Sequence, residues 1–182
     1  GFTGTAREEF VEVIVHVLRF AVDRANVTRG NGGADIAYLF PPKPGQVFLE
    51  AHLQHDLFSW LSNSSLRRGA RREEPDVAAG RADITVTFDH RVVLEIKREQ
   101  YDASFESITR AHAGQAAAYS VVGVPLSVEV VLDLTDHRSG VPSLAESVRV
   151  LAVPVANAAP RHVVAVVVRG NRHTPRETRV AR

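Results

Sequence analysis

The chain has 182 residues, of which 45% are hydrophobic and 24% charged, and its formal net charge at pH 7 is +1. This composition is typical of a globular domain and excludes collagen-like, coiled-coil and wholly disordered chains. The absence of cysteine excludes disulfides, thiolate zinc sites, iron–sulfur clusters and cysteine nucleophiles, and the near-neutral charge indicates no particular partner.

Two features of the sequence bear on its cellular setting. Apolar stretches such as Val163–Val168 are far shorter than the roughly 20 residues that span a bilayer, and no charged-then-apolar leader opens the sequence. We therefore expect a soluble, cytoplasmic protein with no membrane partner. Because the chain begins at Gly1 and contains no Met, we expect it to be excised from a longer polypeptide with additional domains or subunits.

The first third of the chain has the spacing of helices. Apolar residues at helical intervals predict an amphipathic helix over residues 6–23. A glycine-rich break over 26–33 follows it, then a short strand or turn over 34–40 and a proline-rich turn over 41–45. Residues 46–61 repeat the helical spacing and predict a second helix.

The middle of the chain changes to a period of two. Residues 62–80 are polar, rich in arginine and contain Pro75, so they predict a loop. Alternating apolar residues then predict two half-buried strands over 83–88 and 92–97. A two-residue connection would place a carboxylate on the apolar face, whereas a three-residue loop over 89–91 keeps the apolar residues together. The predicted cross-strand pairs are Ile84 with Ile96, Val86 with Leu94, and Phe88 with Val92.

The last part of the chain predicts one more helix and three strands. Asp102 or Ser104 is suited to cap a helix that runs to about Ser120. One face of this helix carries Phe105, Ile108, His112, Gln115 and Tyr119. Runs of β-branched residues predict strands over 126–134, 148–155 and 162–168.

The order of these elements predicts one α/β domain. No internal repeat and no linker divides residues 1–182. Within this domain we distinguish N-terminal helices over 6–61, a catalytic core over 80–170 and a basic tail over 171–182.

Two acids and a lysine share the polar face of the predicted hairpin. Asp83 lies on its first strand, and Glu95 and Lys97, two residues apart on the second, point the same way. Carboxylates are preferred ligands of magnesium and manganese, and a neighbouring ammonium can orient or deprotonate a water and offset charge on a phosphate. The cluster therefore predicts a phosphodiester hydrolysis site, with the main-chain carbonyl of Ile96 as a further ligand of the cation.

Two sequence motifs resemble those of a known family. Gly80-Arg81-Ala82-Asp83, followed after 12 positions by Glu95-Ile96-Lys97 in an apolar strand, resembles the motif of the PD-(D/E)xK nuclease superfamily. Gln115-Ala116-Ala117-Ala118-Tyr119 is similar to the Gln-x-x-x-Tyr motif of its RecB-type exonuclease branch. The resemblance covers about Phe48–Leu134. It implies a restriction-endonuclease-like core, with a mixed β-sheet flanked by helices, and metal-dependent cleavage of nucleic acid.

The resemblance also implies roles for individual residues. Asp83 and Glu95 would be metal ligands, and Lys97 would be the catalytic base or the water-orienting group. Gln115 and Tyr119 would lie near the scissile strand. Many members carry a glutamate on the helix before the sheet, and Glu50 matches it as a further candidate ligand.

The sequence departs from the family motif at one position. Ala82 stands where the superfamily has proline, and a literal Pro75-Asp76 pair occurs upstream. We choose Asp83 over Asp76, because Asp83 lies in the strand beside Glu95 whereas Asp76 falls in the predicted loop. The branch of the superfamily that binds an iron–sulfur cluster is excluded, because this chain has no cysteine.

Arginines form two clusters outside the acidic site. The clusters are Arg67, Arg68, Arg71 and Arg72 in the predicted loop, and Arg169, Arg172, Arg176, Arg179 and Arg182 near the C-terminus. Each is either a phosphate-binding surface or an ordinary solvated segment. Arg81 and His112 are further candidates for phosphate contact, and His52 and His55 fit packing or a surface role better than metal binding.

We predict a magnesium- or manganese-dependent nuclease, with DNA favoured over RNA by family analogy alone. A role as the effector of a bacterial anti-phage, restriction or repair system is consistent with an excised domain, and a homodimer is left open. The alternative is a nuclease-like fold that only binds nucleic acid or holds an assembly together. The three charged residues would then be a solvated ion-pair ladder, and the Gln-x-x-x-Tyr pair a helix edge over the sheet.

Overall fold

Six strands and four α-helices make up the fold of the computed structural model, which describes residues 3–30, 33–77, 80–119, 126–137, 142–155 and 158–173. For residues 73–77, 80, 81, 113, 116, 119, 155 and 158 the backbone alone is described. In chain order the elements are α1 (Thr5–Asn26), η1 (Ala34–Leu39), α2 (Glu50–Ser62), η2 (Ser65–Arg68), β1 (Ala70–Val77), β2 (Gly80–Thr87), β3 (Arg91–Glu99), α3 (Phe105–Ala111), α4 (Ala113–Tyr119), β4 (Leu126–Asp133), η3 (Ala145–Ser147), β5 (Val148–Val155) and β6 (Ala158–Arg169).

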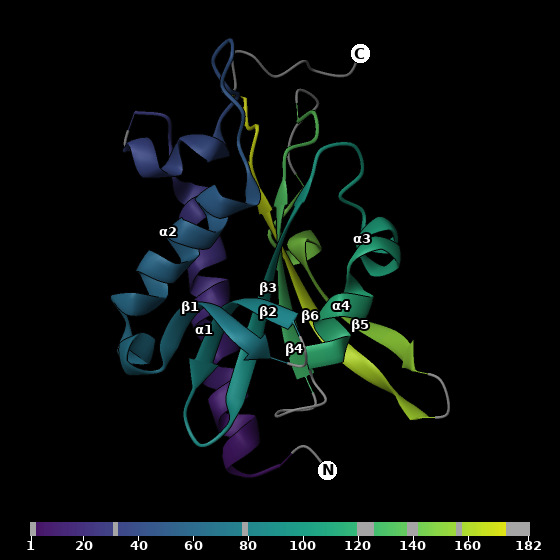
Figure 1. Ribbon diagram of the computed structural model, residues 1–182. Helices are drawn as coiled ribbons and strands as arrows, with labels where there is room; N and C mark the ends of the chain where they lie inside the picture. Colours follow the sequence, from purple (N-terminus) through teal and green to yellow (C-terminus); the bar gives the residue numbers. More distant parts are fainter. Residues whose placement is uncertain are drawn as a thin grey trace.

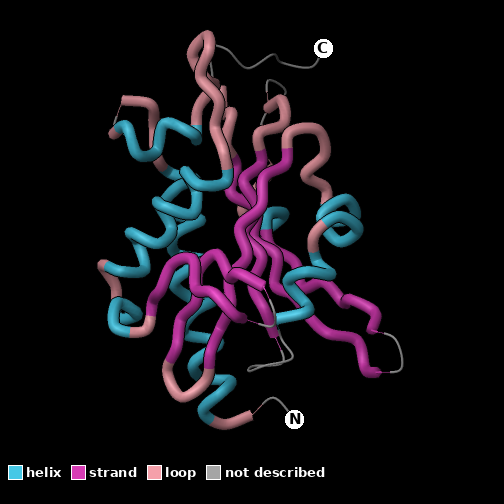
Figure 2. Tube along the Cα trace, viewed as in Figure 1, coloured by secondary structure: helices cyan, strands magenta, loops and turns pink. Residues whose placement is uncertain are grey.

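The strands form one mixed sheet in the order β1-β2-β3-β4-β6-β5. The central strands β3, β4 and β6 run parallel, whereas β1, β2 and β5 are paired antiparallel to their neighbours. Helices α1 and α2 lie on one side of the sheet, and α3 and α4 on the other (Figure 1). The tube in Figure 2 shows the same three layers, with the sheet between the helices. The chain is therefore a mixed α+β protein, with a mixed sheet flanked by helices as the sequence pattern and the family resemblance predict.

Each face of the sheet has its own hydrophobic core, because successive side chains of a strand point to opposite faces. Val128, Val130 and Leu132 of β4 face α1 and α2, whose apolar residues complete the larger core. Val131 of β4 faces the smaller core, to which α3 contributes Phe105. The site described below lies on this second face.

The prediction of a loop over residues 62–80 is wrong. The segment contains η2 and the strand β1, whose residues pair antiparallel with β2. Pro75, the reason for predicting a loop, is compatible with a strand here because β1 is at the edge of the sheet and its pairing with β2 is irregular between Glu74 and Val77, and edges and bulges are where strands accommodate proline. Asp76 consequently lies in a strand and not in a loop.

The hairpin of β2 and β3 has the predicted loop length but a register shifted by two residues. Ile84 pairs with Leu94 and Thr87 with Arg91, so the loop covers residues 88–90 rather than 89–91. A shift of two keeps every side chain on its predicted face. Buried Glu9 of α1 fixes the loop, because its carboxylate accepts hydrogen bonds from the main-chain N–H groups of residues 89 and 90, at 3.2 and 3.0 Å.

Two predicted helices have different limits in the structure. Helix α2 begins at Glu50 rather than at residue 46, because residues 46–49 are irregular, Leu49 is extended, and Arg98 Nη1 binds the Phe48 carbonyl at 2.7 Å. The single helix predicted from Ser104 divides into α3 and α4 at His112, whose ring contacts Glu99 at 2.6 Å on β3. Ser104 does cap α3, as one of the two predicted alternatives.

The other predicted elements are confirmed with small shifts of their ends. They are α1, β4, β5 and β6. The segment over 34–40, predicted as a short strand or turn, is instead the 3-10 helix η1. The end of the third helix at Ser120 and the basic tail beyond residue 173 lie outside the described residues. Among the described helices, none combines the length and apolar character that crossing a bilayer requires.

Asp56 of α2 ties the three N-terminal helices together. It is 5% exposed and accepts hydrogen bonds from Arg24 of α1, at 2.7 and 2.8 Å, and from the Tyr38 hydroxyl of η1, at 2.6 Å. Burial, and next the charge of Asp56, raise the pKa of Tyr38 well above its usual value. The hydrogen bond to Asp56 raises the pKa of Arg24. Tyr38 and Arg24 are therefore both protonated donors at neutral pH.

We expect Asp56→Ala to lower the free energy of unfolding by about 3–5 kcal/mol, because it leaves the part-buried Arg24 without its bidentate acceptor. Asp23→Ala is the matched control, since the exposed Asp23 also pairs with Arg24. It should cost less than about 1 kcal/mol. Urea denaturation followed by circular dichroism measures both variants, and equal losses would contradict the assigned role of Asp56.

Candidate functional site

Strands β2 and β3 bring Asp83 to the backbone beside Glu95. The Asp83 Oδ2 atom accepts a hydrogen bond from the Ile96 N–H at 2.8 Å, and Gln54 of α2 donates to the Asp83 carbonyl at 3.0 Å. In the observed register Ile84 opposes Leu94, so the next positions along the two strands are those of Asp83 and Glu95. The choice of Asp83 as the acid that accompanies Glu95 agrees with this placement.

Glu95 lies at the centre of the polar cluster. Its Oε2 atom accepts hydrogen bonds from Lys97 Nζ at 3.0 Å and from Gln115 Nε2 of α4 at 3.1 Å. The residue is 1% exposed, and its Oε1 atom is buried without a hydrogen-bond partner among the described residues. Burial, followed by the negative charge of Asp83, raises the pKa of Glu95 to about 7 despite the opposing effect of Lys97.

Lys97 stays protonated at neutral pH in this environment. Burial alone would lower its pKa, but the charges of Glu95, and to a smaller extent Asp83 and Glu50, outweigh burial and raise the pKa. An ammonium cannot accept a proton. The electrostatics therefore favour Lys97 as a group that orients water or offsets negative charge, rather than as the base that was the other option.

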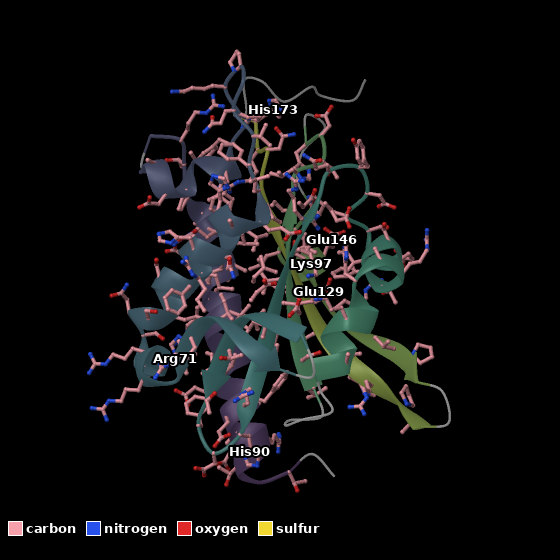
Figure 3. All side chains as sticks on the ribbon, viewed as in Figure 1. Arg71, His90, Lys97, Glu129, Glu146 and His173 are labelled. Carbon is pink, nitrogen blue, oxygen red and sulfur yellow. The ribbon has the colours of Figure 1, made fainter. Side chains whose placement is uncertain are left out.

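A buried carboxylate that sequence reasoning missed lies next to Glu95. Glu129 of β4 pairs with Glu95 in the parallel β3–β4 ladder, so their side chains share one face of the sheet. Glu129 is fully buried, and neither of its carboxylate oxygens has a hydrogen-bond partner within the described ranges. Burial raises its pKa to about 7, while the charge of nearby Lys97 acts in the opposite direction. Figure 3 shows Lys97 and Glu129 near the middle of the sheet.

One sequence signal could have identified Glu129. Positions 127, 129, 131 and 133 of the apolar strand are Ser, Glu, Val and Asp, so polar residues recur at a period of two within a run of β-branched residues. An acid at such a position in a strand buried on both faces needs an explanation. The pairing with Glu95 could not be inferred, because the sequence does not say which strand lies beside β3.

The other predicted site residues differ in their burial and in their contacts with this cluster. Glu50 is exposed at the first position of α2, within electrostatic range of Lys97. The Ile96 side chain is buried in the larger core, and its carbonyl as a metal ligand stays a prediction. His112 binds Glu99 on the same face, two residues beyond Lys97. The side chains of Tyr119 and Arg81 lie outside what the structure describes.

The arginine cluster of residues 67, 68, 71 and 72 is exposed on η2 and the start of β1. Arg71 donates to the carbonyls of Arg68 and Ala70, and the Arg72 guanidinium lies 6.0 Å from the Phe58 ring centre. Figure 3 shows Arg71 well apart from Lys97 and Glu129. The structure therefore does not bring this cluster into the acidic site.

The donor groups of the site suit a hard divalent cation. Asp83, Glu95 and Glu129 offer carboxylate oxygens, and three of these oxygens, one from Glu95 and two from Glu129, are buried without a hydrogen bond in the described part of the chain. No three His, Asp or Glu side chains of the described residues converge into a complete metal-binding group. Magnesium is commonly held by only one or two carboxylates, with water and substrate phosphate completing its shell. The residues present therefore fit such a cation.

Comparison with protein-family models, with curated proteins and with solved structures finds no match for this chain. The family resemblance consequently depends on the two sequence motifs, and the function depends on the geometry of the site.

We expect Glu129→Gln to stabilise the metal-free protein in a pH-dependent way. The pKa of Glu129 rises from 4.5 to about 7 on folding, so ionisation of this carboxyl destabilises the native state. This loss of unfolding free energy is absent below about pH 4.5, grows up to about pH 7 and is constant above it. The variant should unfold with a free energy about 3 kcal/mol higher than wild type at pH 8 and about equal at pH 4.5. Urea denaturation in EDTA at both pH values measures this difference, and an equal or lower stability at pH 8 would contradict it.

Proposed function

We propose that this chain is a metal-dependent nuclease domain that hydrolyses phosphodiester bonds, with DNA favoured as the substrate. The observation that carries the proposal is the buried Glu95, placed between the Lys97 ammonium and the Asp83 strand with one oxygen unpartnered among the described residues. An acid kept almost out of water and only partly hydrogen-bonded is costly for a fold. Such a group fits a catalytic site better than a structural ion pair.

The residues of the cluster would have separate tasks in hydrolysis. Asp83 and Glu95 would hold the cation through their carboxylates, and Glu50 and the Ile96 carbonyl are the further candidates. When bound, such a cation supplies Lewis-acid activation of the phosphate and lowers the pKa of a coordinated water. The Lys97 ammonium would orient the attacking water and offset the negative charge that develops on the phosphorus centre.

Gln115 supports the arrangement from α4. Its amide donates to the same Glu95 oxygen that binds Lys97, and its own side chain is exposed. It would therefore lie between Glu95 and an approaching strand of nucleic acid, as the Gln-x-x-x-Tyr resemblance implies. The restriction-endonuclease-like core is likewise a proposal, which the mixed sheet with helices on both faces supports.

A nucleic-acid-binding or assembly module is the second candidate. One observation favours it, namely that no three potential ligand side chains of the described residues converge on a single point. In that case the acidic cluster would have no catalytic role, and affinity for nucleic acid would depend on the exposed arginines.

We expect Asp83→Ala and Glu95→Ala each to reduce magnesium-dependent cleavage of plasmid and linear DNA at least about a hundredfold while the fold remains intact. Asp76→Ala is the matched control, because it removes an acid from the neighbouring strand β1 and should retain activity. Gel assays with magnesium, manganese or EDTA, on proteins whose folding is verified by circular dichroism, provide the measurement. Undiminished cutting by both site variants, or loss only in Asp76→Ala, would refute the assignment.

Lys97→Ala should separate catalysis from binding. Because the ammonium acts mainly on charge that develops in the transition state, turnover should fall strongly while the affinity for DNA changes little. Single-turnover rates and fluorescence anisotropy measure the two quantities. An equal loss in both, with no hydrolysis by wild type in any metal, would favour the binding module.

Charge reversal in the arginine cluster should have the opposite effect. The double variant Arg67→Glu and Arg71→Glu is expected to weaken DNA affinity and to lower the slope of log affinity against log salt by roughly one unit per lost phosphate contact. Arg19→Glu makes the same type of charge change at an exposed position of α1 and serves as the control. If the control weakens affinity by the same amount per charge, the cluster has no specific role in binding.

A further inference from the structure

Three carboxylate oxygens are buried together without hydrogen bonds in the middle of the sheet. Within the part of the chain that the structure describes, they are Oε1 of Glu95 and both oxygens of Glu129. Buried polar atoms in folded proteins nearly always have a partner, so each exception requires a physical reason. The other unpartnered buried atoms of the described residues are Ser127 Oγ, His137 Nε2 and Arg169 Nε. The three carboxylate oxygens lie on two residues that pair directly across the β3–β4 ladder.

The fold satisfies a buried carboxylate elsewhere on the same strand. Asp133, four residues beyond Glu129 on the same face of β4, is 1% exposed. Its oxygens accept hydrogen bonds from the main chain and hydroxyl of Thr135, at 2.9 and 2.7 Å, and from Arg169. A purely structural acid at this depth is thus surrounded by donors, whereas Glu129 has none among the described residues.

The net negative charge of the cluster also favours binding of a cation. Asp83, Glu95 and Glu129 carry three negative charges when ionised, and Lys97 is the ammonium that acts on both glutamates. Lys97 Nζ binds Glu95 through Oε2, which leaves Oε1 without a partner among the described residues. The sum of these four charges is −2, and one divalent cation would bring it to zero.

One of the groups that contact Glu95 borders solvent. Gln115 of α4 donates to Glu95 Oε2, and its own side chain is exposed.

We propose that Glu129 is a ligand of a divalent cation, magnesium or manganese, which it binds together with Oε1 of Glu95, so that β4 contributes to the site beside β2 and β3. The inference rests on the proposed function, because Glu95 belongs to both. Water and a phosphate oxygen of the substrate supply the remaining ligands. Asp83 on β2 and Glu129 on β4 would then hold the cation from the two strands on either side of β3, which carries Glu95.

The test is Mn²⁺ binding to the whole chain without nucleic acid. Isothermal titration calorimetry and electron paramagnetic resonance of Mn²⁺ at pH 7.5 give affinity and stoichiometry. We expect Glu129→Gln to weaken Mn²⁺ binding at least tenfold or to remove one bound ion. Glu99→Gln is the matched control, because Glu99 lies on the same face of β3 but is paired with His112. Its Mn²⁺ affinity should stay within about threefold of wild type.

Thermal unfolding of the same proteins distinguishes a ligand from a structural acid. In EDTA, Glu129→Gln should melt at a higher temperature than wild type, and Mn²⁺ should raise the melting temperature of the variant less than that of wild type. A variant that melts lower in EDTA or fails to fold would overturn the proposal, because Glu129 would then stabilise the metal-free fold. Wild-type Mn²⁺ affinity in the variant, or no Mn²⁺ binding by wild type, would also overturn it.

Cleavage assays on these proteins separate this inference from the proposed function. If wild type cleaves DNA with magnesium and Glu129→Gln binds Mn²⁺ as wild type does, the inference fails and the nuclease assignment stands. If wild type binds Mn²⁺ through Glu129 but cleaves no nucleic acid, the cation site stands and the nuclease assignment fails.

Discussion

The parallel pairing of β3 with β4 places two glutamates side by side in the interior of the protein. Glu95 and Glu129 are almost completely buried, and burial raises the pKa of each to about 7. The neighbouring groups respond to this concentration of negative charge. Burial lowers the pKa of Lys97, but the charges of Glu95, Asp83 and Glu50 outweigh burial and raise it, and α4 directs the amide of Gln115 toward the Glu95 carboxylate. The second face of the sheet is therefore organised around two buried carboxylates whose negative charge the described side chains only partly offset.

Buried acids elsewhere in the chain show how the fold supplies hydrogen-bond donors to a carboxylate whose role is structural. Asp56 accepts three hydrogen bonds and joins α1, η1 and α2, while Asp133 joins the end of β4 to β6 through Arg169. Both acids are surrounded by donors. Glu95 and Glu129 differ because three of their oxygens lack partners among the described residues. This difference within one molecule is the physical argument for a chemical role of the cluster.

The sequence alone was sufficient to predict which side chains share each face of the β2–β3 hairpin. The period of two assigns each side chain to a face, and a register shift of two residues leaves that assignment unchanged. Asp83 and Glu95 were therefore placed correctly on one face, although the predicted register put Asp83 opposite Lys97 and the observed register, shifted by two residues, puts it opposite Glu95. In the observed register the hairpin loop binds Glu9, a contact that is distant in sequence and that the pattern of apolar residues does not reveal. Strand β1 was missed because Pro75 is a loop signal except at a sheet edge. Glu129 was missed because strand order across a parallel crossover is a tertiary property.

The central claim is that the acidic cluster is a cation site. A crystal of the whole chain soaked in Mn²⁺ tests it directly, because the anomalous scattering of manganese locates the ion independently of any activity. We predict an anomalous peak within coordination distance of the carboxylates of Asp83 and Glu95, with Glu129 turned toward it. A map with no peak at these carboxylates, or with manganese bound only at other acids, would contradict the account.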